Sequence, residues 1–337
     1  MIPFVEYYMI SSETYRQIRY AGSNQKREEL AKENMGKFFP QIPYEQYKKY
    51  LSGDPVFKEI LQTVQNAFKQ CYSFECTDIQ VNNLCQETFN SYAYIDGYNP
   101  VIIHIDQLLE SVIMSFLMVF FKCAKDMEKR ENTDIYFKLL CFIFNEQCIW
   151  GQMPDENAKE VIMKKVSKDS QILNLASDCY WSIILFTVAH EVAHIYQMEK
   201  NPGYWREHLI EAEYNADEIA YDIFLKLIMG KNQKMILEEY TYLTPMMYMD
   251  FFNLYYYTDY ILYETKHNFK DHPTPERRKE RLFEIVDREI YQFDTENGNA
   301  VYQHFCQVYD FYMDKLLEYK VEGKLNMGIH KEARDWR

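Results

Sequence analysis

The stretch FTVAHEVAHIYQ, residues 186–197, places two histidines and a glutamate in the middle of an apolar run. Burying ionisable groups without partners is costly, so these side chains either bond to groups of an ordinary helical core or surround a cation. The spacing His190-Glu191-x-x-His194 favours a cation, because residues four apart on a helix lie one turn above each other and both imidazoles then face the same side.

The next segment, LIEAEYNADEIAYDIF at residues 209–224, carries two carboxylates that can complete such a site. A catalytic zinc ion needs three protein ligands and one vacant position, and Glu213 can supply the third ligand. Asp217, four residues later on the same helical face, can accept the free N–H of a ligating histidine and fix its tautomer. A solvated helix face is the alternative for Glu213, since other acidic residues lie nearby in the segment.

Together these residues predict one zinc ion held by His190, His194 and Glu213. Glu191 is rotated by roughly 100° from His190 on the helix, which places it beside the open position, where it can take a proton from water. Two nitrogens and one oxygen also suit Mn²⁺ and Co²⁺, so zinc is inferred from the ligand types alone.

Composition and charge exclude several classes of protein. The formal charge is −14, which repels phosphate backbones and argues against a nucleic-acid partner. The N-terminus lacks a basic segment followed by an apolar core, and the most apolar runs, 112–121 and 183–189, are shorter than the ~18–20 residues of a membrane span. The eight cysteines form no CxxC pair, as expected of free thiols in a reducing compartment. We therefore expect a cytoplasmic chain with no transmembrane segment.

Few helix breakers, 10 Gly and 10 Pro, favour a mainly α fold with a small β-sheet. The sheet is expected within residues 76–105, where TDIQVNNL and PVIIHID carry β-branched residues around a turn. Helices are predicted from Ser177 or Asp178 to Lys200, over 207–229 and over 245–266. Residues 1–75 have helical spacing and form a separate N-terminal segment.

A third element, DHPTPERRKERL at residues 271–282, reads in isolation as a turn that opens a basic helix. In this order, however, HEVAH, EYNAD and HPTPERR resemble the gluzincin metallopeptidases, in particular the family of the bacterial heat-shock protease HtpX and the CAAX prenyl proteases. The signature of that family is HExxH, then ExxxD, then HPxxxxR. The resemblance implies a zincin-like domain over 76–285, and the helical extensions expected over 1–75 and 286–337 lie outside it.

The resemblance also implies roles for individual residues. Zinc would be held by His190, His194 and Glu213, with Glu191 as the general base. His272 would lie near the substrate oxyanion, where His208 or a tyrosine is the alternative, and Arg278 would brace the site through a carboxylate. Residues 89–110 are similar to the family's edge strand and the helix after it, so a peptide could add antiparallel to a strand over 91–104. A buried structural strand is the alternative role of this segment.

These expectations lead to a zinc-dependent endopeptidase that hydrolyses an intracellular protein or peptide. Two alternatives stay open. The chain could be a non-catalytic zinc-binding sensor or regulatory module, although such a site has no need of Glu191. It could also be a phage-defence or toxin-like peptidase that a regulatory partner activates, similar to phage-exclusion peptidases such as Lit. The unmatched helical flanks are the feature behind this last hypothesis.

Overall fold

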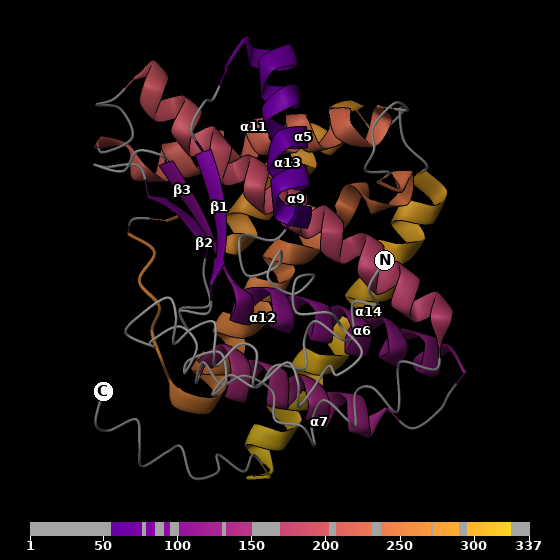
Figure 1. The fold of residues 1–337 in the computed structure, drawn as a ribbon. Helices are drawn as coiled ribbons and strands as arrows, with labels where there is room; N and C mark the ends of the chain where they lie inside the picture. The colour runs from indigo at the N-terminus through magenta and orange to yellow at the C-terminus, as the bar shows by residue number, and fades with distance from the viewer. Residues whose placement is uncertain are drawn as a thin grey trace, which may run out of the picture.

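The computed structural model describes residues 55–75, 79–84, 91–94, 101–129, 133–149, 169–201, 207–230, 237–270, 272–289 and 295–324. Residues 1–54 of the predicted N-terminal segment lie outside this described part. The prediction of a mainly helical fold with a small sheet is confirmed within it (Figure 1). In chain order the elements are α5 (Pro55–Tyr72), β1 (Ile79–Leu84), β2 (Ser91–Tyr94), β3 (Val101–Asp106), α6 (Gln107–Glu128), α7 (Asp134–Phe142), the π-helix η1 (Ile143–Ile149), α9 (Ser170–Lys200), α11 (Leu209–Met229), the 3₁₀-helix η2 (Glu239–Leu243), α12 (Thr244–Tyr263), α13 (Pro275–Glu289) and α14 (Thr295–Val321).

Helix α9 is the long central helix that carries the HEVAH motif. It ends at Lys200 as predicted, but it begins at Ser170, earlier than the predicted cap at Ser177 or Asp178. The side chain of Asp169 caps the helix by accepting a hydrogen bond from the backbone N–H of Ile172. Asp178 lies in the helix interior instead and accepts a hydrogen bond from a tyrosine hydroxyl of η2. The prediction of the helix start was therefore wrong, because a polar residue inside the helix was taken for its cap.

Length and apolar composition would allow α9 to cross a membrane, and it is the one helix among the described residues of which this is true. Its most apolar window is, however, 67% buried inside the molecule. That burial is what the core helix of a soluble protein shows.

The sheet has three strands in the order β1-β3-β2, with β1 parallel and β2 antiparallel to β3. Ile103 and Ile105 of the central strand β3 are fully buried. It runs directly into α6, whose first turn is capped by the side chain of Asp106. The expectation of one strand over 91–104 was therefore wrong. Residues 91–94 form β2 at the edge of the described sheet, whereas 101–106 form its centre and are paired on both sides.

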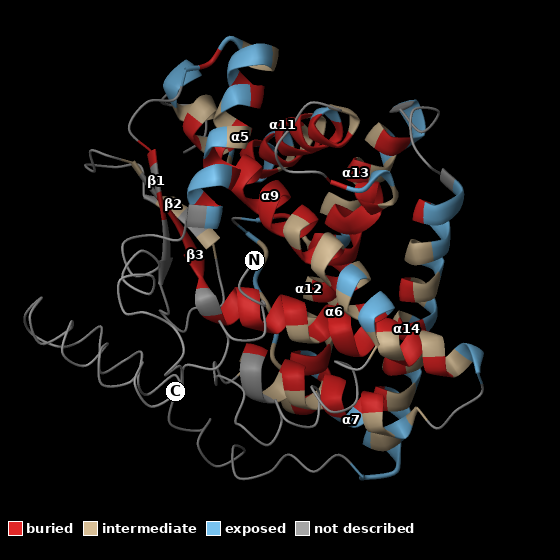
Figure 2. Ribbon diagram, turned by 45° about the vertical axis from the view of Figure 1, so that its right-hand side comes forward, coloured by how far each residue is buried: buried red, intermediate tan, exposed pale blue. Residues whose placement is uncertain are grey.

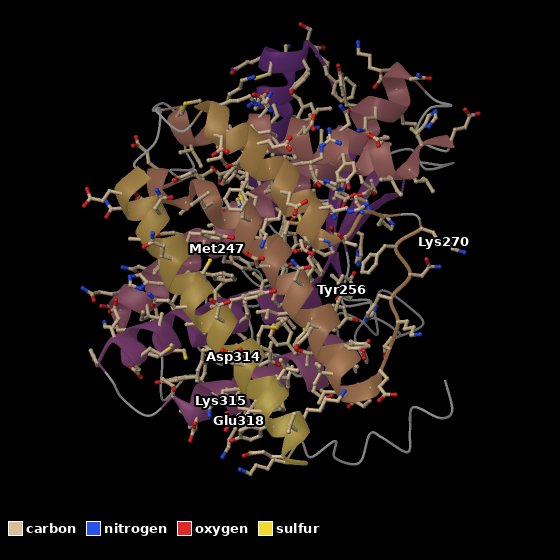
Figure 3. The ribbon with its side chains drawn as sticks, turned by 180° about the vertical axis from the view of Figure 1, so that it is seen from behind. Met247, Tyr256, Lys270, Asp314, Lys315 and Glu318 are labelled. Carbon is tan, nitrogen blue, oxygen red and sulfur yellow. The ribbon has the colours of Figure 1, made fainter. Side chains whose placement is uncertain are left out.

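The remaining helices enclose α9. Helices α11, α6 and α5 pack directly against it, and in Figure 2 it runs through the buried interior. Seen from behind, α12 lies beside α14, with Met247 and Tyr256 on the first helix and Lys315 and Glu318 on the second (Figure 3). One hydrophobic core extends from Phe57 in α5 to Leu316 in α14. The described parts of both predicted extensions thus contribute to the same core as the central domain.

Candidate metal centre

Two neighbouring helices, α9 and α11, bring the predicted ligands together. His190 and His194 are one turn apart in α9, and their Nε2 atoms lie 3.0 Å from each other. The Glu213 carboxylate of α11 faces both rings. Its Oε2 is 3.5 Å from Nε2 of His190 and its Oε1 is 3.3 Å from Nε2 of His194. Within the described residues, these three side chains form a group whose ligand atoms converge closely enough for a metal ion.

The separations between these atoms fit a tetrahedral metal ion. With ligand bonds of about 2.0–2.1 Å, the ligand atoms around tetrahedral zinc stand about 3.3 Å apart. The nearest separations between the three side chains, 3.0, 3.3 and 3.5 Å, are close to that value, with Glu213 facing His190 through Oε2 and His194 through Oε1. The side chains of His190, Glu213 and His194 are only 10%, 11% and 19% exposed, so a cation here would be largely withdrawn from water. The residues present therefore fit one zinc ion.

Asp217 lies behind His190, one turn further along α11 from Glu213. Its Oδ1 is 3.0 Å from Nδ1 of His190, an ion-pair distance, although the ring N–H is not aligned well enough for a hydrogen bond. Arg278 of α13 donates two hydrogen bonds of 2.6 Å to the same carboxylate, from Nε to Oδ2 and from Nη2 to Oδ1. The carboxylate is thereby held in one orientation between a histidine and a guanidinium. Paired, buried groups of this kind orient metal ligands from behind.

The charges in the cluster favour a cation at its centre. Burial alone would raise the pKa of the Glu213 carboxyl, but hydrogen bonds from His190, His194 and His272 hold that pKa well below its usual range. Burial likewise opposes charging of His190, yet Asp217 and Glu213 outweigh it and raise its pKa to about 10. The carboxylates around His190 therefore favour a positive charge at the centre of the cluster.

Glu191, the predicted general base, directly follows His190 in α9 and is buried, with 5% of its surface exposed. The hydroxyl of Ser91 donates a 2.9 Å hydrogen bond to its Oε1. Ser91 is the first residue of β2, so the edge of the sheet contacts α9 next to the ligand cluster.

His272, predicted near the oxyanion, contacts the cluster from its exposed side. Its Nδ1 is 3.1 Å from Oε1 of Glu213, and its side chain is 69% exposed. The segment that carries it leads into α13, which begins at Pro275. His208, named as an alternative donor, is exposed at the N-terminus of α11. Of these two histidines, the structure places His272 against a predicted metal ligand.

Two residues with contacts at this site were missed by the sequence analysis. Gln197 contacts His194, and its position three residues further along the same helix could have indicated this. Ser91 contacts Glu191 from a point 100 residues away in the chain, and nothing local in the sequence signals that contact.

Comparison of the chain with protein-family models, with curated proteins and with solved structures found no match in any of the three.

Proposed function

We propose that the chain is a zinc-dependent endopeptidase with a zincin-like core, in which His190, His194 and Glu213 hold one metal ion and Glu191 is the general base. The observation that carries this proposal is the convergence of two imidazoles and a carboxylate to 3.0–3.5 Å, with a buried glutamate directly after the first histidine. A purely structural zinc site has no need of that glutamate, since all its coordination positions are filled by protein.

Bound zinc would supply Lewis acidity that polarises a carbonyl group and makes water acidic near neutral pH. In the proposed reaction a carboxylate oxygen of Glu191 accepts a proton from water as the water oxygen attacks the carbonyl carbon. The C–N bond then breaks, and Glu191 returns the proton to the nitrogen of the leaving amine. Ser91 holds Oε1 of this carboxylate, which leaves Oε2 to carry the proton.

The other residues of the cluster position these groups. His272 is exposed and touches a ligand, so it is placed to donate a hydrogen bond to the substrate carbonyl oxygen as negative charge develops there. Arg278 and Asp217 keep the ring of His190 in one orientation. An extended substrate would approach along β2, the edge strand that already contacts Glu191.

The substrate we propose is a protein or peptide of the cytoplasm. The burial of α9 supports a soluble chain, and the six described cysteines are free, as in a reducing compartment. The net charge of −14 favours protein over nucleic acid as the partner.

The test is a comparison of new protein N-termini in cells that express the wild type or the Glu191→Gln variant. The matched control is Glu199→Gln, which removes the same charge from an exposed position of the same helix. We expect new N-termini with the wild type and the control, and none with Glu191→Gln, while all three proteins carry one zinc ion.

Two results would contradict the proposal. Unchanged cleavage by zinc-loaded Glu191→Gln would exclude this residue as the base. A zinc-loaded wild type that generates no new N-termini in cells, and none in a denatured proteome in vitro, would favour the non-catalytic sensor instead.

A further inference from the structure

We infer that Gln197 is a positioning residue of the metal centre, which sets the tautomer of His194 and ties that ligand to the backbone beside Glu213. The inference rests on metal binding as proposed above, and it concerns a residue outside the predicted signature. Gln197 lies three residues after His194 in α9, and its side chain is half-buried between α9 and α11.

The orientation of the Gln197 amide follows from its partners. Its Nε2 donates to the backbone carbonyl of Ala212 at 2.8 Å and to Oδ1 of Asn215 at 3.0 Å. A carbonyl oxygen can only accept, so the nitrogen end of the amide must face Ala212 and the oxygen end must face the other way. That oxygen, Oε1, lies 3.2 Å from Nδ1 of His194.

The tautomer of His194 follows in turn. Because Oε1 of Gln197 is an acceptor only, Nδ1 of His194 must carry the hydrogen of the neutral ring. The other ring nitrogen, Nε2, then presents its lone pair to the cluster. The carboxylate of Asp217 beside Nδ1 of His190 favours the same tautomer in the second ring.

Two lone pairs that face each other across 3.0 Å repel unless a cation or a proton lies between them. Asp217 and Gln197 together therefore prepare both imidazoles for a metal ion before it arrives. The two supports differ in charge, since Asp217 is a carboxylate paired with Arg278 whereas Gln197 is neutral.

Gln197 also connects two of the ligands across the interface between the helices. Ala212, whose carbonyl it binds, directly precedes Glu213 in α11. One amide thus contacts His194 with its oxygen and the backbone next to Glu213 with its nitrogen. Removing it releases the ring of one ligand and the first turn of the helix that carries another.

The experiment separates these two contacts with two substitutions. Gln197→Met keeps the length of the side chain and loses both contacts. Gln197→Glu keeps an acceptor for Nδ1 of His194 and loses the donor to Ala212. Asn215→Ala is the matched control, because it removes one partner of the amide nitrogen and leaves the oxygen end untouched.

The measurement is zinc affinity, by competition with a chromophoric chelator, together with the absorption spectrum of the cobalt-loaded chain. We expect Gln197→Met to lose about 10- to 100-fold in affinity, as for other groups that support a metal-bound histidine. Gln197→Glu loses only the tie to Ala212, so it should lose less affinity than Gln197→Met and keep the cobalt spectrum of the wild type. Asn215→Ala should stay within about threefold of the wild type.

The inference would be overturned if folded Gln197→Met kept the zinc affinity and the cobalt spectrum of the wild type. Equal losses of zinc affinity in the Met and Glu variants would also overturn it, because a merely structural contact predicts equal losses. If Gln197→Met does not fold, weak zinc binding by folded Gln197→Glu overturns it alone. Failure of the wild type to bind zinc overturns both proposals, whereas zinc binding without hydrolysis removes the peptidase proposal only.

Discussion

Replacing Arg278 by Met should destabilise the protein far more than replacing a neighbouring surface arginine. Asp217 is 1% exposed and accepts two charge-assisted hydrogen bonds of 2.6 Å from Arg278. Burial of Asp217 disfavours its charge, and the guanidinium outweighs burial, so the pKa of the carboxyl lies below its usual value. Without Arg278 this buried charge loses its main partner.

The expected cost is about 3–5 kcal/mol of unfolding free energy, the range for breaking a buried ion pair by removing one member. The control is Arg281→Met, one turn nearer the C-terminus of α13. Arg281 pairs with Glu218 at 2.7 Å, but its side chain is 39% exposed. An exposed pair of this kind contributes only about 0.2–1 kcal/mol.

Urea denaturation in the presence of a metal chelator measures both variants, so that metal binding does not add to the stability of the folded state. The single variant Asp217→Asn and the double variant Arg278→Met/Asp217→Asn complete a double-mutant cycle. The double variant removes both charges, so we expect it to be more stable than Arg278→Met alone. A loss for Arg278→Met no larger than that for Arg281→Met would refute the reasoning, and so would a double variant that costs the sum of the single changes.

Three further predictions concern the proposed base, the proposed oxyanion donor and two cysteine thiols. Ser91→Ala removes the hydrogen bond to Glu191, worth about 1.5 kcal/mol, so kcat should fall about tenfold while KM changes little. Ser91→Thr keeps a hydroxyl and should restore kcat, and an equal loss of kcat in the Thr variant would contradict the role of this hydrogen bond. His272→Ala should lower kcat and leave one zinc ion per chain by elemental analysis, and loss of zinc would instead make His272 a support of the ligands. Burial raises the pKa of Cys123 and Cys141 to about 12, so neither thiol should react with iodoacetamide at pH 8 before the chain unfolds. Their contribution to stability should be complete below about pH 8.5 and lost as the pH rises toward 12. Mass spectrometry of the labelled folded chain checks the reactivity, and rapid modification of either thiol would contradict the prediction.

Local patterns predicted the parts of this fold that depend on local contacts. The class of the fold, the end of α9 and the positions of α11 and α12 within a few residues follow from helical spacing and from breakers such as Pro202-Gly203. The start of α9 was predicted too late, because Ser177 and Asp178 have the chemistry of a cap and the sequence does not show that the helix passes through them.

The sheet shows more clearly which contacts local sequence patterns do not predict. The stretches that form β1 and β3 were recognised, but β2 was not predicted as a separate strand and the pairing was not predicted. Residues 91–94 and 101–106 occupy an edge and a centre because β1 pairs in parallel with β3, a contact between segments that only the complete fold brings together. Ser91 contacts Glu191 from β2, which is held in place by its antiparallel pairing with β3.

Within the candidate site, the side chains that converge come from motifs that could be read from the chain. Spacing on α9 and α11 predicted that His190, His194 and Glu213 face one point, and the structure places one ligand atom of each within 4.8 Å of the others. The contact between Gln197 and His194 is equally local, but glutamine has no strong metal signature and was passed over.

The most direct test of the account is X-ray absorption spectroscopy on the chain loaded with one equivalent of zinc. We expect stoichiometric binding and a first shell of two imidazole nitrogens and carboxylate or water oxygens at about 2.0–2.1 Å, all lost in a His190→Ala/His194→Ala variant. Sulfur scattering at about 2.3 Å, or zinc retained unchanged by that double variant, would contradict it.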